Sequence, residues 1–230
     1  SSSFDVVDID GDKDLDIVYT AGDNADFTTV LKPYHGMYIF ENTGGFAFKQ
    51  KAFFSQNGAT KVMPGDFDGD GDMDVLAFES AGHFITYFEN IGDLKFSTKS
   101  MNWGNFYLTD CEDITFGLVP ESIKQTQSTA AVQHAGNTLS LWDPDKNGIY
   151  DLIIGHVGCP KFIFSRNEGT RLKPSFKAAE YNFPASAPHV VPSLPSASPM
   201  DLDGDGALDL IASSHLPDLN PSLETASYYR

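Results

Sequence analysis

The stretch DFDGDGDMDV, residues 66–75, decides the fold because it places a carboxylate at every second position. Unit charges at this spacing repel one another by about 1 kcal/mol or more, even at the dielectric of a protein surface. A folded chain that concentrates negative charge in one turn is therefore expected to hold a cation there.

This acidic stretch occurs four times, as DIDGDKDLD (8–16), DFDGDGDMD (66–74), DPDKNGIYD (143–151) and DLDGDGALD (201–209). The copies begin 58, 77 and 58 residues apart. The spacing indicates a tandem unit of 58 residues, with an insertion of about 19 residues that we place within residues 97–140.

Each copy runs directly into a short apolar stretch (LDIVYT, MDVLAF, YDLIIG, LDLIAS), and in the first three an aromatic segment closed by Asn42, Asn90 or Asn167 follows. Further short apolar segments flank these two, and no window has a sustained helical period. About four strands per unit, repeated in tandem, predict an all-β β-propeller with four recognisable blades. A sandwich or a β-solenoid is the alternative, although solenoid periods are much shorter. Because the chain stops at ASYYR, where earlier units approach their Asn turn, we expect residues 1–230 to belong to a larger propeller.

Numbered 1 to 9, each loop has side-chain oxygens at positions 1, 3, 5 and 9, and three loops have glycine at position 6. Such dense oxygen ligation suits Ca²⁺, with position 7 giving its backbone carbonyl. Lys13 replaces the glycine in the first loop, so we expect a weaker site there. EF-hands are excluded, because position 12 is never Glu. Asp, Asn and Gly also simply favour turns, but four copies in register argue against that reading alone. The predicted ligands are Asp8, Asp10, Asp12, Asp14, Asp16, Asp66, Asp68, Asp70, Asp72, Asp74, Asp143, Asp145, Asn147, Ile149, Asp151, Asp201, Asp203, Asp205, Ala207 and Asp209.

Composition restricts the class of protein. The chain is 41% hydrophobic, which suffices for a core, and it has 15 basic against 32 acidic residues, for a formal charge of -17. No basic patch is visible, so nucleic acid is not an expected partner. No apolar run is long enough to span a membrane.

The start, SSSFDVVDID, has no signal-peptide pattern, and we interpret residue 1 as a cut start. Up to four structural Ca²⁺ would bring the charge to about -9. Weak calcium sites of about 10⁻⁴ to 10⁻³ M function outside cells, which predicts a secreted or cell-surface location.

The chain resembles the FG-GAP/VCBS repeat family, whose calcium-loop propeller blades also occur in integrin α-chain heads and in bacterial surface proteins. The resemblance rests on GDFDGDGDMDVLAF with YFENIGD, on DPDKNGIYDLIIG with SRNEG, and on DLDGDGALDLIAS. VLKPYHGMYIFENTGG and HAGNTLSLWDPDKNG are also similar to segments of secreted Bacteroidetes repeat proteins exported by type IX secretion. The family implies a surface-exposed binding or scaffold domain and does not imply one ligand. We expect the domain to act in adhesion or in protein or carbohydrate interaction at the cell surface.

The sequence contains no recognisable catalytic motif, and we expect the six histidines to be surface or loop residues. The alternative, a propeller of a secreted polysaccharide lyase or hydrolase, requires a pocket with carboxylates or His outside the four loops. Cys111 and Cys159 form either one disulfide or two buried thiols. Aromatic residues of the insertion, such as Trp103 and Phe106, either fill gaps between sheets or form a binding face, and KPYHGMY (32–38) is a second candidate contact loop. The Pro-rich segment 183–199 is predicted to be an extended connection.

Overall fold

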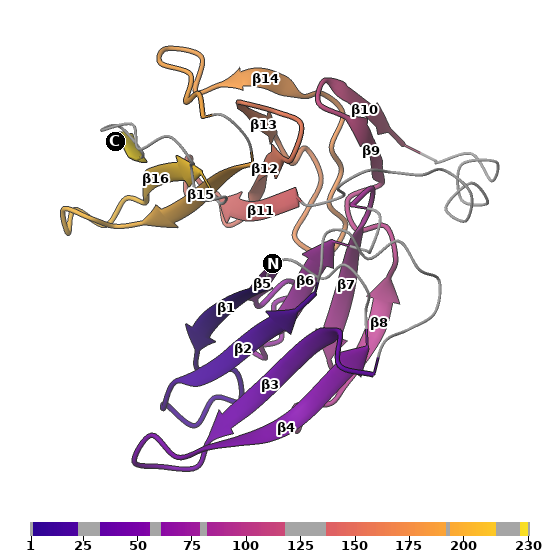
Figure 1. The fold of residues 1–230 in the computed structure, drawn as a ribbon, viewed down its shortest axis with the longest axis vertical. Helices are drawn as coiled ribbons and strands as arrows, with labels where there is room; N and C mark the ends of the chain where they lie inside the picture. The colour runs from indigo at the N-terminus through magenta and orange to yellow at the C-terminus, as the bar shows by residue number, and fades with distance from the viewer. Residues whose placement is uncertain are drawn as a thin grey trace.

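The computed structural model describes residues 2–22, 33–55, 61–78, 82–117, 137–191, 194–214 and 226–229 (Figure 1). All regular secondary structure in these ranges is β-strand. Within the same ranges, nothing qualifies as a membrane-crossing helix by length and apolarity. The prediction of an all-β protein is confirmed.

The described strands form four blade sheets that follow one another around the molecule, each an antiparallel meander, and one additional two-stranded hairpin (Figure 1). Blade 1 comprises β1 (Ser2–Val7), β2 (Asp16–Ala21), β3 (Gly36–Asn42) and β4 (Phe48–Ser55). Blade 2 comprises β5 (Val62–Gly65), β6 (Asp74–Phe78), β7 (Ile85–Asn90) and β8 (Phe96–Ser100). Blade 3 comprises β11 (Asn137–Trp142), β12 (Asp151–His156), β13 (Phe162–Ser165) and β14 (Glu180–Phe183). Blade 4 comprises, among the described residues, β15 (Pro195–Met200), β16 (Asp209–Ser214) and β17 (Ala226–Tyr229).

Sequential four-stranded meanders arranged blade after blade define a β-propeller, as predicted. The predicted strands are all found: the apolar stretch after each acidic loop is the second strand of a blade, and the aromatic segment is the third in blades 1 to 3. The Pro-rich segment differs in part from the prediction of a connection, because its last residues form β15, the first strand of blade 4.

The core lies between blades, and strand alternation decides which side chains enter it. We count positions along the second strand of each blade from the Asp that ends the acidic loop, taken as zero. Positions +1 and +3, with their cross-strand partners, form the odd face of a blade, and +2 and +4 form the even face. Side chains on opposite faces therefore pack against different neighbouring blades.

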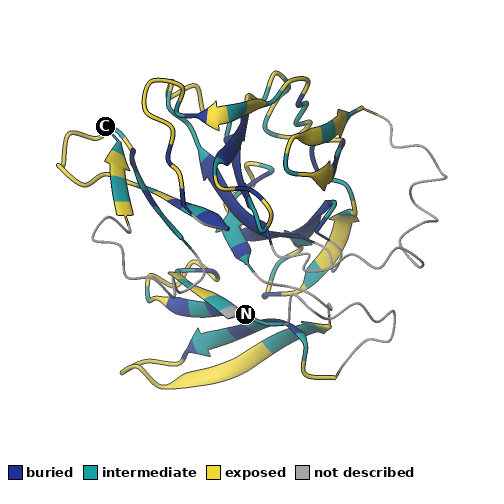
Figure 2. Ribbon diagram, turned by 45° about the horizontal axis from the view of Figure 1, so that its top comes forward, coloured by how far each residue is buried: buried dark blue, intermediate teal, exposed yellow. Residues whose placement is uncertain are grey.

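Three hydrophobic clusters follow this rule. Even-face Val18 of blade 1 packs with odd-face Val75 and Ala77 of blade 2. Even-face residues of blade 2 pack with odd-face residues of blade 3, namely Leu76, Phe78, Leu152 and Ile154. Even-face residues of blade 3 then pack with odd-face residues of blade 4, namely Ile153, Leu210 and Ala212. Buried residues therefore concentrate in the inner strands of adjacent sheets, while the outer strand β4 is largely exposed (Figure 2).

The insertion between blades 2 and 3 contains a hairpin of β9 (Phe106–Asp110) and β10 (Asp113–Phe116). Trp103 and Phe106 are buried in the cluster between blades 2 and 3, which confirms that these aromatic residues fill a gap between sheets. Residues 118–136 of the insertion, Lys32 of the KPYHGMY loop, His134 and His215 lie outside the described residues.

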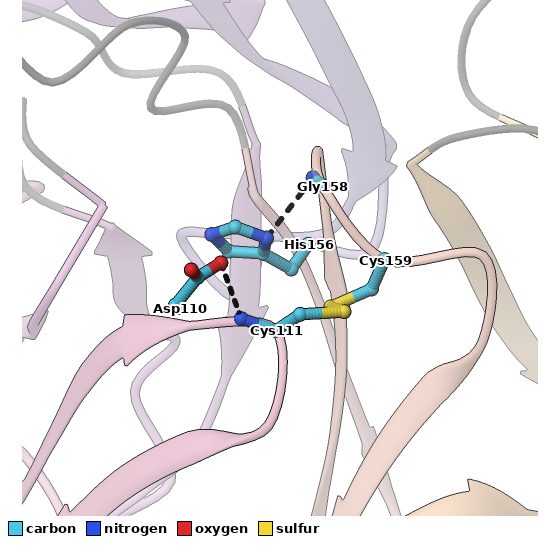
Figure 3. The surroundings of a disulfide bond; sticks show 5 residues. All are labelled: Asp110, Cys111, His156, Gly158 and Cys159. Atoms are coloured by element: carbon cyan, nitrogen blue, oxygen red, sulfur yellow. Dashed lines mark hydrogen bonds between the residues drawn. A yellow bond between two sulfur atoms is a disulfide. The ribbon is translucent and has the colours of Figure 1, made fainter.

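Cys111 and Cys159 form a disulfide that ties the turn of this hairpin to the loop after β12 (Figure 3). Of the two alternatives left open by the sequence, the disulfide is the one in the structure. It joins residues 48 apart in the chain and so fastens the insertion to blade 3.

Candidate metal centres

Each acidic loop is the turn between the first and second strands of a blade, so all four loops occupy equivalent places in the propeller. Their backbone is left-handed at positions 4 and 6. At position 6, Gly71, Gly148 and Gly206 have φ of 98°, 79° and 82°, and Lys13 takes the same conformation with φ of 76°. Lys13 therefore costs conformational free energy at position 6, because residues other than glycine are disfavoured at positive φ.

Hydrogen bonds to backbone amides shape each loop and engage one oxygen of most carboxylates. In the second loop, Gly69 N donates to Asp66 Oδ1 (2.6 Å), Asp70 N to Asp68 Oδ1 (3.2 Å) and Asp72 N to Asp70 Oδ1 (2.9 Å). The last of these bonds, from the position 7 amide to the position 5 side chain, is present in all four loops. The turn preference of Asp and Asn therefore helps to build the loop that gathers the remaining oxygens.

Three of the four loops bring carboxylate oxygens within 4.8 Å of one another, a spacing that fits one shared cation. The groups are Asp8, Asp10 and Asp16 in the first loop, Asp66, Asp68 and Asp70 in the second, and Asp201, Asp203 and Asp209 in the fourth. Burial, opposed by a backbone hydrogen bond, raises the pKa of Asp10 and of Asp68, and neighbouring carboxylates raise it further. A bound cation would remove this electrostatic cost.

The remaining predicted ligands lie at the edges of these groups. Asp12 and Asp205, at position 5, each accept a backbone amide from position 7. Asp72 is exposed and Ala207 half-buried. Asp14 Oδ1 is buried and has no hydrogen-bond partner among the described residues, which is the state expected of an oxygen built to face a cation.

The aspartate at position 9 has a second task that the sequence did not reveal. Asp74 is fully buried; its Oδ2 accepts Phe67 N (2.9 Å) and its Oδ1 accepts Asn90 N (2.9 Å). Tyr87 Oη donates to the same carboxylate at 2.9 Å, and burial raises the pKa of this tyrosine so that it remains a donor. Position 9 thereby clamps the acidic loop to the turn after the third strand of the same blade.

The recurring asparagine is the other half of this clamp. Asn42 N donates to Asp16 Oδ1 (2.8 Å), and Asn42 Nδ2 donates to the Leu15 carbonyl (3.3 Å). The same two contacts are made by Asn90 and Asn167 in blades 2 and 3. The in-register repetition of asparagine was visible in the sequence, but its partner was not.

The third loop departs from the pattern. Pro144 at position 2 has no amide hydrogen to donate to Asp151, and Arg166 instead lies 3.8 Å from Asp145 Oδ2 and 4.0 Å from Asp151 Oδ2. Asp143 accepts the amides of Asn147 and Gly148. Ile149 is half-buried at position 7. The Arg166 guanidinium thus places positive charge beside the third loop, and the carboxylates of this loop do not form a close group.

Cations from blade 3 also reach neighbouring loops. Arg171 donates from Nε (3.0 Å) and Nη2 to the Asp66 carbonyl, and its Nη2 lies 3.2 Å from Asp66 Oδ2. Lys146 Nζ donates to the Gly206 carbonyl of the fourth loop at 2.9 Å. These contacts couple the loops of successive blades, a link that no sequence pattern indicated.

Between blades 2 and 3, beside the second loop, lies a hollow of about 350 Å³. Its wall combines aromatic Tyr87 and Trp103 with Lys99, Arg171 and Lys173. A second hollow of about 380 Å³ adjoins it at Asn105. Neither is lined by His, and Asp68 of the second metal loop is the one carboxylate in their described lining.

A different polar cluster flanks the disulfide (Figure 3). His156 Nδ1 accepts Gly158 N at 3.0 Å, and Asp110 Oδ1 accepts Cys111 N at 2.7 Å. Burial lowers the pKa of His156, although the Asp110 charge opposes the shift. His189 lies in a loop, as expected, but it is buried there, and its ring stacks on that of Phe162 with a centroid distance of 5.6 Å.

The fold and the loops define a class: a β-propeller whose blades carry acidic loops between their first and second strands. Residues 8–77, which run from the first acidic loop through most of β6, match the family model described as FG-GAP-like repeat. This match supports the repeat family predicted from the loops. The comparison with curated proteins gave no match.

Among solved structures, a lectin of Agrocybe aegerita is similar, with 15% sequence identity and a TM-score of 0.41. Its description concerns specific recognition of non-reducing terminal N-acetylglucosamine. The alignment covers 92% of this chain and 60% of the lectin chain, so the present chain spans less than two thirds of that structure.

Proposed function

We propose that this propeller is a calcium-stabilised binding or scaffold domain, and that it acts through binding without catalysis. The observation that carries the proposal is the convergence of carboxylate oxygens within 4.8 Å in the first, second and fourth loops. An oxygen-only donor set of this density suits Ca²⁺, which takes 6 to 8 oxygens, better than metals that prefer nitrogen or sulfur. The residues that would hold the ion are those of positions 1 and 3, joined by position 9 in the first and fourth loops and by position 5 in the second.

The proposed role of the metal is structural. Each ion would offset two of the negative charges of one loop and, through Asp16 or its equivalent, fix the adjacent turn of the same blade. A ligand bound only to the folded state stabilises it by RT ln(1 + [L]/Kd), about 2.7 kcal/mol per site at a hundredfold excess over Kd. Weak sites of this kind suit the calcium levels outside cells, which supports a secreted or cell-surface location, as the resemblance to exported bacterial repeat proteins also does.

The proposed ligand is a protein or a carbohydrate at the cell surface. The hollow between blades 2 and 3 is the candidate contact region, because it presents aromatic and cationic side chains beside a metal loop. Aromatic rings with a few convergent polar groups are the usual lining of small-ligand sites.

Titrating the metal-free protein with Ca²⁺ tests whether it binds the ion. Native mass spectrometry counts the bound ions, and calorimetry measures the melting temperature. We expect three bound Ca²⁺, because the first, second and fourth loops form close carboxylate groups and the third does not. Asp203→Ala should reduce the count to two, whereas the matched change Asp145→Ala in the third loop should leave it at three. An unchanged melting temperature at millimolar Ca²⁺, or no bound ion, would reject the proposal.

A further inference from the structure

The hollow between blades 2 and 3 collects positive charge in an acidic chain. Together with the hollow that adjoins it at Asn105, it is lined by four of the chain's 15 basic residues, namely Lys99, Arg171, Lys173 and Lys177. Blades 2 and 3 are both four-stranded in the described residues, so the two sheets that flank the hollow are present. The charge of this lining favours an anionic ligand.

Two of these four cations are already balanced by a nearby carboxylate. Lys99 Nζ lies 2.6 Å from Glu89 Oε1, and Lys177 Nζ lies 2.7 Å from Glu168 Oε2. Lys173 is exposed, and its Nζ has no ion-pair partner among the described residues. Lys173 is therefore available to an anion from outside the chain.

Arg171 holds a second available donor in a fixed position. Its Nε and Nη2 donate to the Asp66 carbonyl, and Nη2 also lies 3.2 Å from Asp66 Oδ2. Its Nη1 has no acceptor among the residues that the structure describes. Because blade 2 already orders the guanidinium, a ligand that accepts from Nη1 would not have to immobilise the side chain.

A tight turn of blade 3 carries both cations. Thr170 N donates to the Lys173 carbonyl (3.0 Å) and Lys173 N donates to the Thr170 carbonyl (3.2 Å), so Arg171 and Leu172 form a two-residue hairpin loop. A Cβ at Gly169 would clash with the Lys173 carbonyl, so the turn needs glycine in order to close. The two cations are thereby positioned by one rigid element.

The insertion supplies carboxamides to the same wall. It packs so closely on blade 3 that a Cβ at Gly104 would meet the Phe176 ring at 2.5 Å. On either side of Gly104, Asn102 and Asn105 line the hollow. Asn105 is exposed with a left-handed φ of 53°, and its side-chain amide has no partner among the described residues. A carboxamide both donates and accepts hydrogen bonds, as the recognition of sugar hydroxyls requires.

We propose that the hollow binds an acidic saccharide, with the carboxylate of one uronate unit on Arg171 and Lys173. Hydroxyls of that unit or of its neighbour bind to Asn102 and Asn105. This inference rests on the proposed function, because it names the ligand of the binding domain. Asp68 belongs both to this wall and to the second acidic loop, so Ca²⁺ bound in that loop would offset its charge.

The arrangement distinguishes this ligand from a strand with a charge on every unit. The available cations lie together beside uncharged amides, so they suit one carboxylate next to neutral sugars. The net charge of -17 would repel a long polyanion such as a nucleic acid. A volume of about 350 Å³ is in the range of small-ligand sites.

Calorimetric titration of the Ca²⁺-loaded chain with xylotriose that carries one methylglucuronate unit tests the proposal. The methyl ester of the same saccharide is the matched neutral ligand, and it should bind about tenfold more weakly or less. Lys173→Gln should also weaken binding of the acid about tenfold, because a charge-assisted hydrogen bond is lost. Asn105→Gly, which permits the left-handed backbone but removes the amide, should weaken it about threefold.

Lys49→Gln is the matched control, because Lys49 is an exposed lysine on β4 of blade 1, and it should bind the acid as the parent does. Lys173 and Asn105 are exposed, so the melting temperatures of their variants should equal that of the parent. Equal binding of acid and ester, full binding by Lys173→Gln, or equal weakening by Lys49→Gln would each overturn the proposal. Equally tight binding of a short peptide with one aspartate would also overturn it, in favour of a protein ligand.

Native mass spectrometry of the same samples separates this inference from the proposed calcium sites. Three bound Ca²⁺ without saccharide binding would overturn the inference and leave the metal proposal standing. Saccharide binding that is lost in Lys173→Gln, in a chain that binds no Ca²⁺, would support the saccharide site and reject the metal.

Discussion

Replacing Asp74 tests whether the position 9 aspartate is a clamp in its own right, apart from any metal. Its carboxylate accepts hydrogen bonds from Phe67 N, Asn90 N and Tyr87 Oη, all at 2.9 Å, and it is fully buried. Asp74→Ala removes all three bonds and leaves three donors without an acceptor. Hydrogen bonds to a charged group contribute about 1.5–3 kcal/mol each.

The net cost is smaller than the sum of the three bonds, because removing the carboxylate also relieves its own burial. That burial raises the pKa of Asp74, which shows that its charge is held at a cost. We therefore expect Asp74→Ala to lower the free energy of unfolding by about 4 kcal/mol, and the melting temperature by about 8–16 °C for a chain of this size. Asp74→Asn, which keeps one acceptor oxygen, should cost about half as much.

Urea unfolding in metal-free buffer, followed by the fluorescence of buried Trp103, measures this difference. Asp72→Ala in the same loop is the matched control, because Asp72 is exposed and only its backbone amide is hydrogen-bonded. The free energy of unfolding lost by Asp72→Ala should be near zero. A loss below about 1 kcal/mol for Asp74→Ala, or equal losses for the two variants, would refute the clamp.

Two further predictions concern titratable groups. Lys61 donates only long hydrogen bonds, to Ser140 Oγ (3.3 Å) and the Ala197 carbonyl (3.5 Å), and burial lowers its pKa from 10.5 to about 8. Lys61→Met should therefore raise the free energy of unfolding at pH 7 by about 2–3 kcal/mol, as measured by urea unfolding. In the parent, stability should rise between pH 8 and 10.5, because in this range the folded protein has lost the Lys61 proton and the unfolded chain still holds it. Lys61→Met should abolish this rise. The calcium-induced rise in melting temperature should shrink as pH falls toward the raised pKa values of Asp10 and Asp68, because burial holds these pKa values above the usual Asp range and protons then compete with Ca²⁺ for the same oxygens. In metal-free protein the same two groups contribute stability that is present at low pH and lost as pH rises through their raised pKa values; a calcium effect that is constant with pH would contradict this.

Local features were predictable because their causes lie within a few residues. The alternation of carboxylates, the glycine at position 6 and the apolar stretch that follows fixed the loop, the second strand and the repeat. Lys13 shows the strength of this local control, since it takes a left-handed φ of 76° in a loop otherwise built on glycine. The asparagine turns were visible for the same reason, as repeated letters, but their role was not.

The rest depended on contacts between residues far apart in the chain. Arg171 reaches the Asp66 carbonyl across 105 residues, and Lys61 reaches Ala197 across 136. Which carboxylates lie beside a guanidinium, whether two cysteines meet, and which sheet faces pack together are consequences of how blades stack. The sequence by itself determined the blades and their acidic loops, because hydrophobic period and turn chemistry act locally. Only the tertiary structure decided which charges meet and which faces pack together, because those depend on the packing of one sheet against the next.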